Sequence, residues 1–393
     1  MQRQAYALVG AAAAIAAAVG PLLGGFITTY LSWRVAFGGE VVIIGLVLLG
    51  SRRVHDVPYT GSRGVDYVGA ILSAVGMSGV VLGILVWQEG GGAVGALIAV
   101  GLVALGTLGW WLRKRKREGK PALLDAGLFA SKYFRLGISS QTLQQISLGG
   151  LMIALPIYLQ MVLEYNALEA GLSLAPLSLS MFAVALLAGK RAGRRSPSKI
   201  IRAGFLLLAA GVAVLIPVVP RAHSGWWMVV PLLIAGCGLG LLVSQLNNYT
   251  LSPIEEERVS EAAGVNSAGG SFGLAFGLAF AGAIMLASLS LLFTHYSDNS
   301  KVLSPAEQQQ VSKGLEKNAE VITNTHLDEL LDGQPEDVQA EIIHINTIAR
   351  PRALQIALLV PLMAALLGLL NGFRMTRLPD PEPSGAAENV LGG

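Results

Sequence analysis

The sequence is poor in charge and has almost no cysteine. Only 13% of its 393 residues are charged, and Cys237 is the single cysteine, whereas soluble domains usually carry about 25% charged residues. One thiol cannot form an internal disulfide and excludes a cysteine-based metal site. All five histidines lie outside the long apolar runs, and no residues stand at the spacing of metal ligands. We therefore expect no enzyme, no metal and no cofactor.

Long apolar runs dominate what is present. The chain is 53% hydrophobic and contains 48 glycines, and a helix that crosses a bilayer needs about 20 apolar residues. The runs lack the alternation of membrane barrels and predict an all-α polytopic membrane protein of about ten transmembrane helices. Gly236-x-Gly238-x-Gly240 lies inside one run and predicts helix packing, not a nucleotide loop. The predicted spans are 5–31, 35–50, 67–87, 93–112, 136–163, 171–188, 200–219, 226–249, 262–293 and 354–373.

Lysine and arginine recur in every second loop, with their densest cluster at residues 113–117. The opposite short loops contain only Arg34 and Arg221. Because cytoplasmic loops are enriched in Lys and Arg, both termini of a multi-pass protein of the cell membrane are predicted to be cytoplasmic. This bias also accounts for the basic pI, so no nucleic-acid partner is expected. The 113–117 cluster is either a topology anchor or a site that attracts anionic lipid.

One long polar, acidic loop, residues 294–350, falls on the extracytoplasmic side. Ser304-Pro305-Ala306-Glu307 predicts a helix start, with a serine cap, proline at the first position and glutamate at the third. Gly333-Gln334-Pro335 predicts a break followed by a new helix that leads to the last span. The tail, residues 379–393, is rich in Pro, Gly and Ser and is predicted to be disordered.

Amide side chains are the main polar groups inside the predicted spans. Gln141, Gln144 and Gln145 stand at i, i+3 and i+4, so they share one helix face, and Gln245 and Asn248 repeat this spacing. An amide both donates and accepts hydrogen bonds, which suits contact with varied substrates. The alternative is hydrogen bonding between helices of the bundle.

Acidic residues are rare in the spans. Glu40 is the candidate buried acid and proton site, although an interfacial carboxylate that reaches water is the favoured alternative. Asp66, Glu89, Glu164 and Glu169 stand at span edges, where we expect solvated loop charges.

The first span ends in Gly20-Pro21-Leu22-Leu23-Gly24-Gly25. Gly20 and Gly24 share a helix face that allows close helix approach, and Pro21 kinks the helix. Trp33-Arg34-x-x-Phe37 follows at the outer end. This combination resembles the antiporter motif of major facilitator drug exporters.

Other marks of that family follow in its order. They are Asp66-Tyr67-Val68-Gly69, Leu128-Phe129-x4-Phe134, Pro156-x-Tyr158-Leu159-Gln160 and Ala167-Leu168-Glu169-Ala170-Gly171. Together they resemble the fourteen-helix drug:proton antiporters. The resemblance implies proton-coupled efflux of hydrophobic or amphipathic compounds by alternating access, with the bilayer, a small substrate and protons as partners.

The same resemblance implies that the first four helices of the family are missing. A truncated gene, a mis-started reading frame or a partner chain that supplies these helices would each account for this. The alternative is a non-transporting membrane fragment or subunit that binds a partner chain. The implied organisation is a remnant of the N-terminal bundle (two helices, 1–50), an inserted helix pair with a basic cytoplasmic loop (51–120), five helices of the C-terminal bundle (121–293), the acidic loop (294–350), the last transmembrane helix (351–378) and the cytoplasmic tail (379–393).

Overall fold

A computed structural model describes residues 20, 23–51, 66–88, 92–120, 122–190, 196–255, 258–317 and 323–381. Regular structure in these ranges is helical, without strands, and nine of the helices there are long and apolar enough to cross a membrane. They overlap nine of the ten predicted spans. The other, 5–31, lies largely outside the described residues. The helices are η1 Ile27–Leu31, α2 Trp33–Ser51, α3 Tyr67–Gln88, α4 Val94–Arg117, η2 Ala126–Ala130, α5 Lys132–Met161, α6 Ala167–Lys190, α7 Pro197–Val218, η3 Val219–Arg221, η4 Gly225–Met228, α8 Val229–Leu251, α9 Val259–Asp298, α10 Pro305–Lys317, α11 Asn324–Leu330, α12 Glu336–Ala357 and α13 Leu359–Met375.

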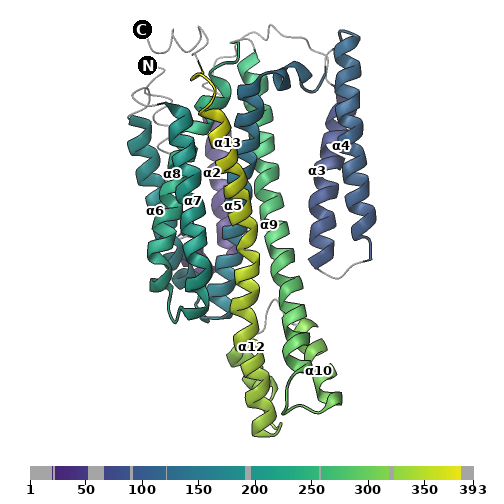
Figure 1. The fold of residues 1–393 in the computed structure, drawn as a ribbon, viewed down its shortest axis with the longest axis vertical. Helices are drawn as coiled ribbons and strands as arrows, with labels where there is room; N and C mark the ends of the chain where they lie inside the picture. Colours follow the sequence, from purple (N-terminus) through teal and green to yellow (C-terminus); the bar gives the residue numbers. More distant parts are fainter. Residues whose placement is uncertain are drawn as a thin grey trace.

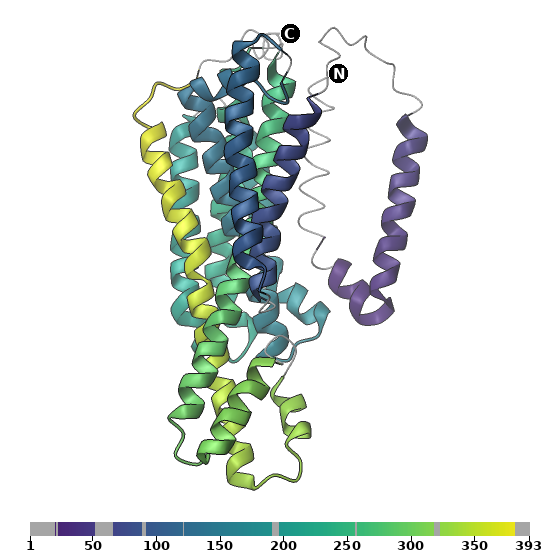
Figure 2. The ribbon, with the colours of Figure 1, turned by 90° about the vertical axis from the view of Figure 1, so that its right-hand side faces the viewer.

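The main bundle consists of α5 to α9 together with α13 (Figure 1). Within it α5 packs on α9 and α13, and α8 lies between α6 and α7. The pair α3 and α4 stands beside α9, against which α3 packs through Val80 and Ile84. Helix α2 has no buried residue and stands away from the bundle in Figure 2.

Small residues bring the helices of the bundle together, as the glycine pattern predicts. Gly236 and Gly240 of α8 face α6, while Gly238, between them, faces α7: a Cβ at Gly240 would lie 2.5 Å from Met181 O, and one at Gly238 2.5 Å from Leu208 N. This glycine row of α8 therefore packs against both α6 and α7. The prediction that Gly236, Gly238 and Gly240 serve helix packing is confirmed.

A second glycine row forms the contact between α5 and α9. A Cβ at Gly273 would lie 2.6 Å from Thr142 O, and one at Gly277 would collide with Ile146 O. Gly264, on the same helix, has no described atom within 4 Å of its Cβ position. The glycines that face α5 are therefore crowded, whereas Gly264, on the same helix, has open space around it.

The last span differs from the predicted run 354–373. Its first residues belong to α12, and α13 begins only at Leu359. Pro361 explains the break, because it has no N–H to offer Ala357 O and its ring crowds that carbonyl.

The predicted acidic loop is largely helical. A lobe projects at one end of the molecule (Figures 1 and 2). It consists of the last turns of α9, of α10 and α11, and of the first half of α12. Ser304 N donates to Glu307 Oε2 at 2.8 Å, which confirms the predicted start of α10. Gly333 has a φ of +90°, and Pro335 occupies the N-cap position of α12, so the predicted break and new helix are also confirmed.

Candidate functional site

The described part of the glycine motif meets the bundle at Gly25. A Cβ there would lie 2.6 Å from Ala167 O, and Leu168 N donates to Thr29 Oγ1 at 3.1 Å. The motif therefore touches the start of α6 through Gly25 and the π-helix η1 that follows it. No described atom lies within 4 Å of a Cβ at Gly20 or Gly24, and Pro21 lies outside the described residues.

The residues after the motif begin α2. Ser32 Oγ accepts from Arg34 N at 3.3 Å, and the Arg34 guanidinium lies 5.3 Å from the centre of the Trp33 ring. Glu40, one to two turns further on, is exposed and makes no hydrogen bond or ion pair within the described part of the chain. The structure thus places the candidate proton acid on the helix that stands apart.

The three glutamines of α5 point toward the interior of the bundle. Gln144 is 2% exposed, and a Cβ at Gly270 of α9 would lie 3.5 Å from Gln141 Nε2 and 3.7 Å from Gln145 Cγ. The Oε1 atoms of Gln144 and Gln145 are buried and have no hydrogen-bond partner among the described residues. A buried amide without a partner costs about 1–3 kcal/mol, so these acceptors are available to a donor that enters the bundle.

The two candidate amides of α8, Gln245 and Asn248, lie in different environments. Gln245 is buried, and its Nε2 has no partner within the described ranges, whereas Asn248 is exposed and accepts from Ser252 Oγ at 2.9 Å. Asn247 accepts from Asn266 Nδ2 of α9 at 2.8 Å. Sequence reasoning missed Asn266, although an asparagine inside an apolar run was a usable signal.

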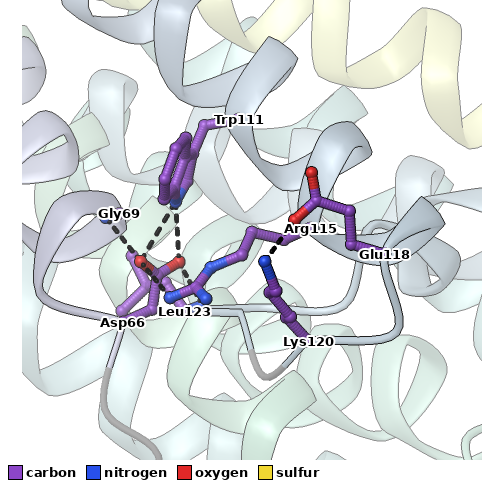
Figure 3. Close-up of polar contacts among 7 residues, drawn as sticks. All are labelled: Asp66, Gly69, Trp111, Arg115, Glu118, Lys120 and Leu123. Atoms are coloured by element: carbon purple, nitrogen blue, oxygen red, sulfur yellow. Dashed lines mark hydrogen bonds and ion pairs between the residues drawn. The ribbon is translucent and has the colours of Figure 1, made fainter.

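Asp66 is buried and not the solvated loop charge expected from its position, since it is only 3% exposed. Four donors surround its carboxylate, as Figure 3 shows. Gly69 N donates at 2.9 Å, Trp111 Nε1 at 3.0 Å, Leu123 N at 3.0 Å and Arg115 Nη2 at 3.3 Å. Burial raises the pKa of Asp66, but these hydrogen bonds outweigh it and hold the pKa below its ordinary value. One charge thereby joins the start of α3, the end of α4 and the segment that leads to α5.

A second polar cluster continues from that segment to α9. Asp125 pairs with Arg258 Nη2 at 2.8 Å and with Lys116 Nζ at 3.1 Å. Asp125 N also donates to Glu261, in the first turn of α9. These contacts fasten the α3–α4 pair to the main bundle at one end.

Arg350 is another buried charge that sequence reasoning missed. It is 6% exposed; its Nε donates to Asn346 Oδ1 at 2.8 Å, and its Nη2 has no partner in the ranges that the structure describes. Buried cations without a carboxylate partner are rare, so Arg350 is a candidate for function.

In the ranges that the structure describes, nine membrane-length helices packed through glycines around a few amides define a polytopic membrane protein. The sequence also shows to which family of membrane proteins the chain belongs. The sequence profile of the Major Facilitator Superfamily matches residues 2–278, so the chain belongs to that family, whose members are transporters and not enzymes.

Individual relatives agree with the family. The Multidrug resistance protein B homolog of Mycobacterium tuberculosis is 27% identical over 315 residues, 77% of this chain and 55% of that protein. The Puromycin resistance protein pur8 of Streptomyces alboniger is 31% identical over 284 residues, 69% of this chain and 55% of that protein. A probable actinorhodin transporter of Streptomyces coelicolor is 25% identical over 282 residues, 67% of this chain and 47% of that protein. The chain spans about half the length of the curated relatives it matches.

Proposed function

We propose that the protein takes part in proton-driven efflux of hydrophobic or amphipathic compounds by alternating access, as a member of the fourteen-helix drug:proton antiporter branch. The names of the relatives, which include multidrug and puromycin resistance proteins, support this substrate class.

One observation carries the proposal for the substrate site. Gln144 and Gln145 have buried acceptor oxygens, and Gln245 has a buried donor, that find no partner among the described residues. Groups that bonded helix to helix would be paired with each other, and in these ranges they are not. We propose that Gln141, Gln144, Gln145, Gln245 and Asn248 contact substrate during the transport cycle. The unpartnered groups support this for Gln144, Gln145 and Gln245, and helix spacing supports it for Gln141 and Asn248.

The proposed proton site is Glu40, and the proposed antiporter motif comprises Gly20, Pro21, Gly24 and Gly25 with Trp33 and Arg34. The close contact of Gly25 with the start of α6 supports a role at the joint between the two halves. We further propose that α3 and α4 are the inserted pair and α5 to α9 with α13 the C-terminal bundle.

We propose that both termini and the 113–117 cluster are cytoplasmic and that the projecting lobe is extracytoplasmic. Reporter fusions after residue 120 and within α10 test this orientation. A result that puts both fusions on the same side of the membrane would contradict it.

The substrate site is tested by Gln145→Leu in a bacterial strain that lacks its own efflux pumps. Loss of a hydrogen bond worth about 0.6–1.4 kcal/mol should weaken apparent substrate affinity about threefold to tenfold. Gln160→Leu is the matched control, because Gln160 Nε2 bonds Pro156 O near the end of α5.

Thermal unfolding separates the two roles of Gln145. If Gln145 contacts substrate, the leucine variant keeps or gains stability, since an unpartnered buried oxygen is removed. A clear loss of stability with unchanged transport would show that the amide joins helices. Failure of the unmodified protein to extrude any amphipathic dye would favour the alternative of a non-transporting subunit.

A further inference from the structure

The end of α4 carries its cations on two different faces. Arg115 turns inward to Asp66, together with Trp111 (Figure 3), and Lys116 pairs with Asp125. The cluster at residues 113–117 is therefore not one uniform patch, because part of its charge is neutralised within the protein.

The other face consists of Trp110, Arg113, Lys114 and Arg117, at i, i+3, i+4 and i+7, and we call it the Trp110 face. All four side chains are exposed. None of the three cations has a carboxylate partner in the described part of the chain, and Lys114 Nζ lies 5.3 Å from the centre of the Trp110 ring. Glu118, which pairs with Lys120 Nζ at 2.8 Å, also interacts with the charge of Lys114. Among the described residues, Arg113 and Arg117 thus keep their charges unpaired within two helical turns.

The surface of α4 on the membrane side of these cations is apolar. Leu102 is 58% exposed, Val103 is 67% exposed and Trp110 is 58% exposed. An apolar column that changes to cations at a tryptophan is the pattern of a spanning helix at the membrane surface. Acyl chains therefore meet the column, and headgroups meet the cations.

We propose that the Trp110 face binds the phosphate headgroup of an anionic phospholipid. Guanidinium groups contact phosphate oxygens through paired donors, Lys114 adds a third charge, and Trp110 occupies the boundary between headgroup and acyl chain. A free anion would use the cations but not the apolar column, so the surface fits a lipid. This inference does not depend on what the protein transports.

Native mass spectrometry of the detergent-purified protein tests the proposal, with phosphatidylglycerol and phosphatidylcholine of equal chain length as probes. The protein should bind phosphatidylglycerol in preference. At about fivefold for each charge, Arg113→Gln/Arg117→Gln should weaken this binding about 25-fold. Trp110→Leu should weaken it as well, whereas Arg113→Lys/Arg117→Lys should keep most of it.

The matched control is Arg374→Gln/Arg377→Gln, which removes the same charge from exposed positions at the end of α13, at the same end of the bundle as the Trp110 face (Figure 1). This control should bind phosphatidylglycerol like the unmodified protein. Equal losses in the two glutamine variants, equal binding of the two lipids, or displacement of the lipid by millimolar inorganic phosphate would each overturn the proposal. All substituted side chains are exposed, and circular dichroism verifies that the variants fold.

Discussion

Replacing Asp66 by asparagine removes the one charge that four donors share. An amide has a single acceptor oxygen and turns its own NH2 donors toward the donors of the protein. Each hydrogen bond to a charged acceptor is worth about 1.5–3 kcal/mol. Arg115 retains some contact with water, since its side chain is 21% exposed, so the loss stays below that of a fully buried ion pair. We expect the α3–α4 pair to be held less firmly by about 2–3 kcal/mol.

Hydrogen exchange measures this loss locally. A loss of about 2 kcal/mol raises the population of the open state about 30-fold, and exchange of the amides in the peptides 66–75 and 122–130 should accelerate accordingly. Asp298→Asn is the control, because Asp298 is exposed at the end of α9. Exchange within threefold of the unmodified protein in both peptides would refute the reasoning that Asp66 joins these segments.

The pH dependence of the same peptides provides a second readout. Because the pKa of folded Asp66 is below its ordinary value of 3.8, its contribution to stability is complete above that value and is lost as pH falls through the lower, folded pKa. Protection should therefore be unchanged between pH 7 and pH 5.

Three further outcomes follow from other parts of the fold. Gly277→Val should destabilise the contact between α5 and α9 by about 1–3 kcal/mol in thermal unfolding, while Gly264→Val should cost less because its surroundings are open; equal losses would contradict the packing argument. Glu164→Gln should release α11, since Glu164 accepts from Thr325 N at 2.9 Å and also from its hydroxyl, and limited proteolysis of the lobe should then accelerate. Burial raises the pKa of Glu164, but the bonds from Thr325 lower it below 4.5. The contact should therefore hold above pH 4.5 and be lost as pH falls through that lowered pKa. Arg350→Met should leave the free energy of unfolding unchanged or raise it by about 1–3 kcal/mol, because the guanidinium is buried without a counter-ion among the described residues; a large loss would show that it has a partner in solution.

Local sequence was sufficient for the spans and for the helix starts. Length and hydropathy of each run identified the nine membrane-length helices that lie in the described residues, and the Ser304–Glu307 cap was correct because both partners lie within one turn. The glycine row of α8 was interpreted correctly as packing, but which glycines face α6 and which face α7 required the structure.

By itself the sequence determined that this is a polytopic helical membrane protein, because membrane crossing depends on the composition of each segment alone. Its motifs resembled the major facilitator family, and the profile match over residues 2–278 showed that the chain belongs to it. Only the tertiary structure decided which charges are buried. The sequence predicted a loop charge at Asp66 because Trp111, Arg115 and Leu123, which surround it, lie 45 to 57 positions further along the chain. The same folding turned Arg115 inward and left Arg113 and Arg117 on the outer face, since neighbours on a helix point in different directions.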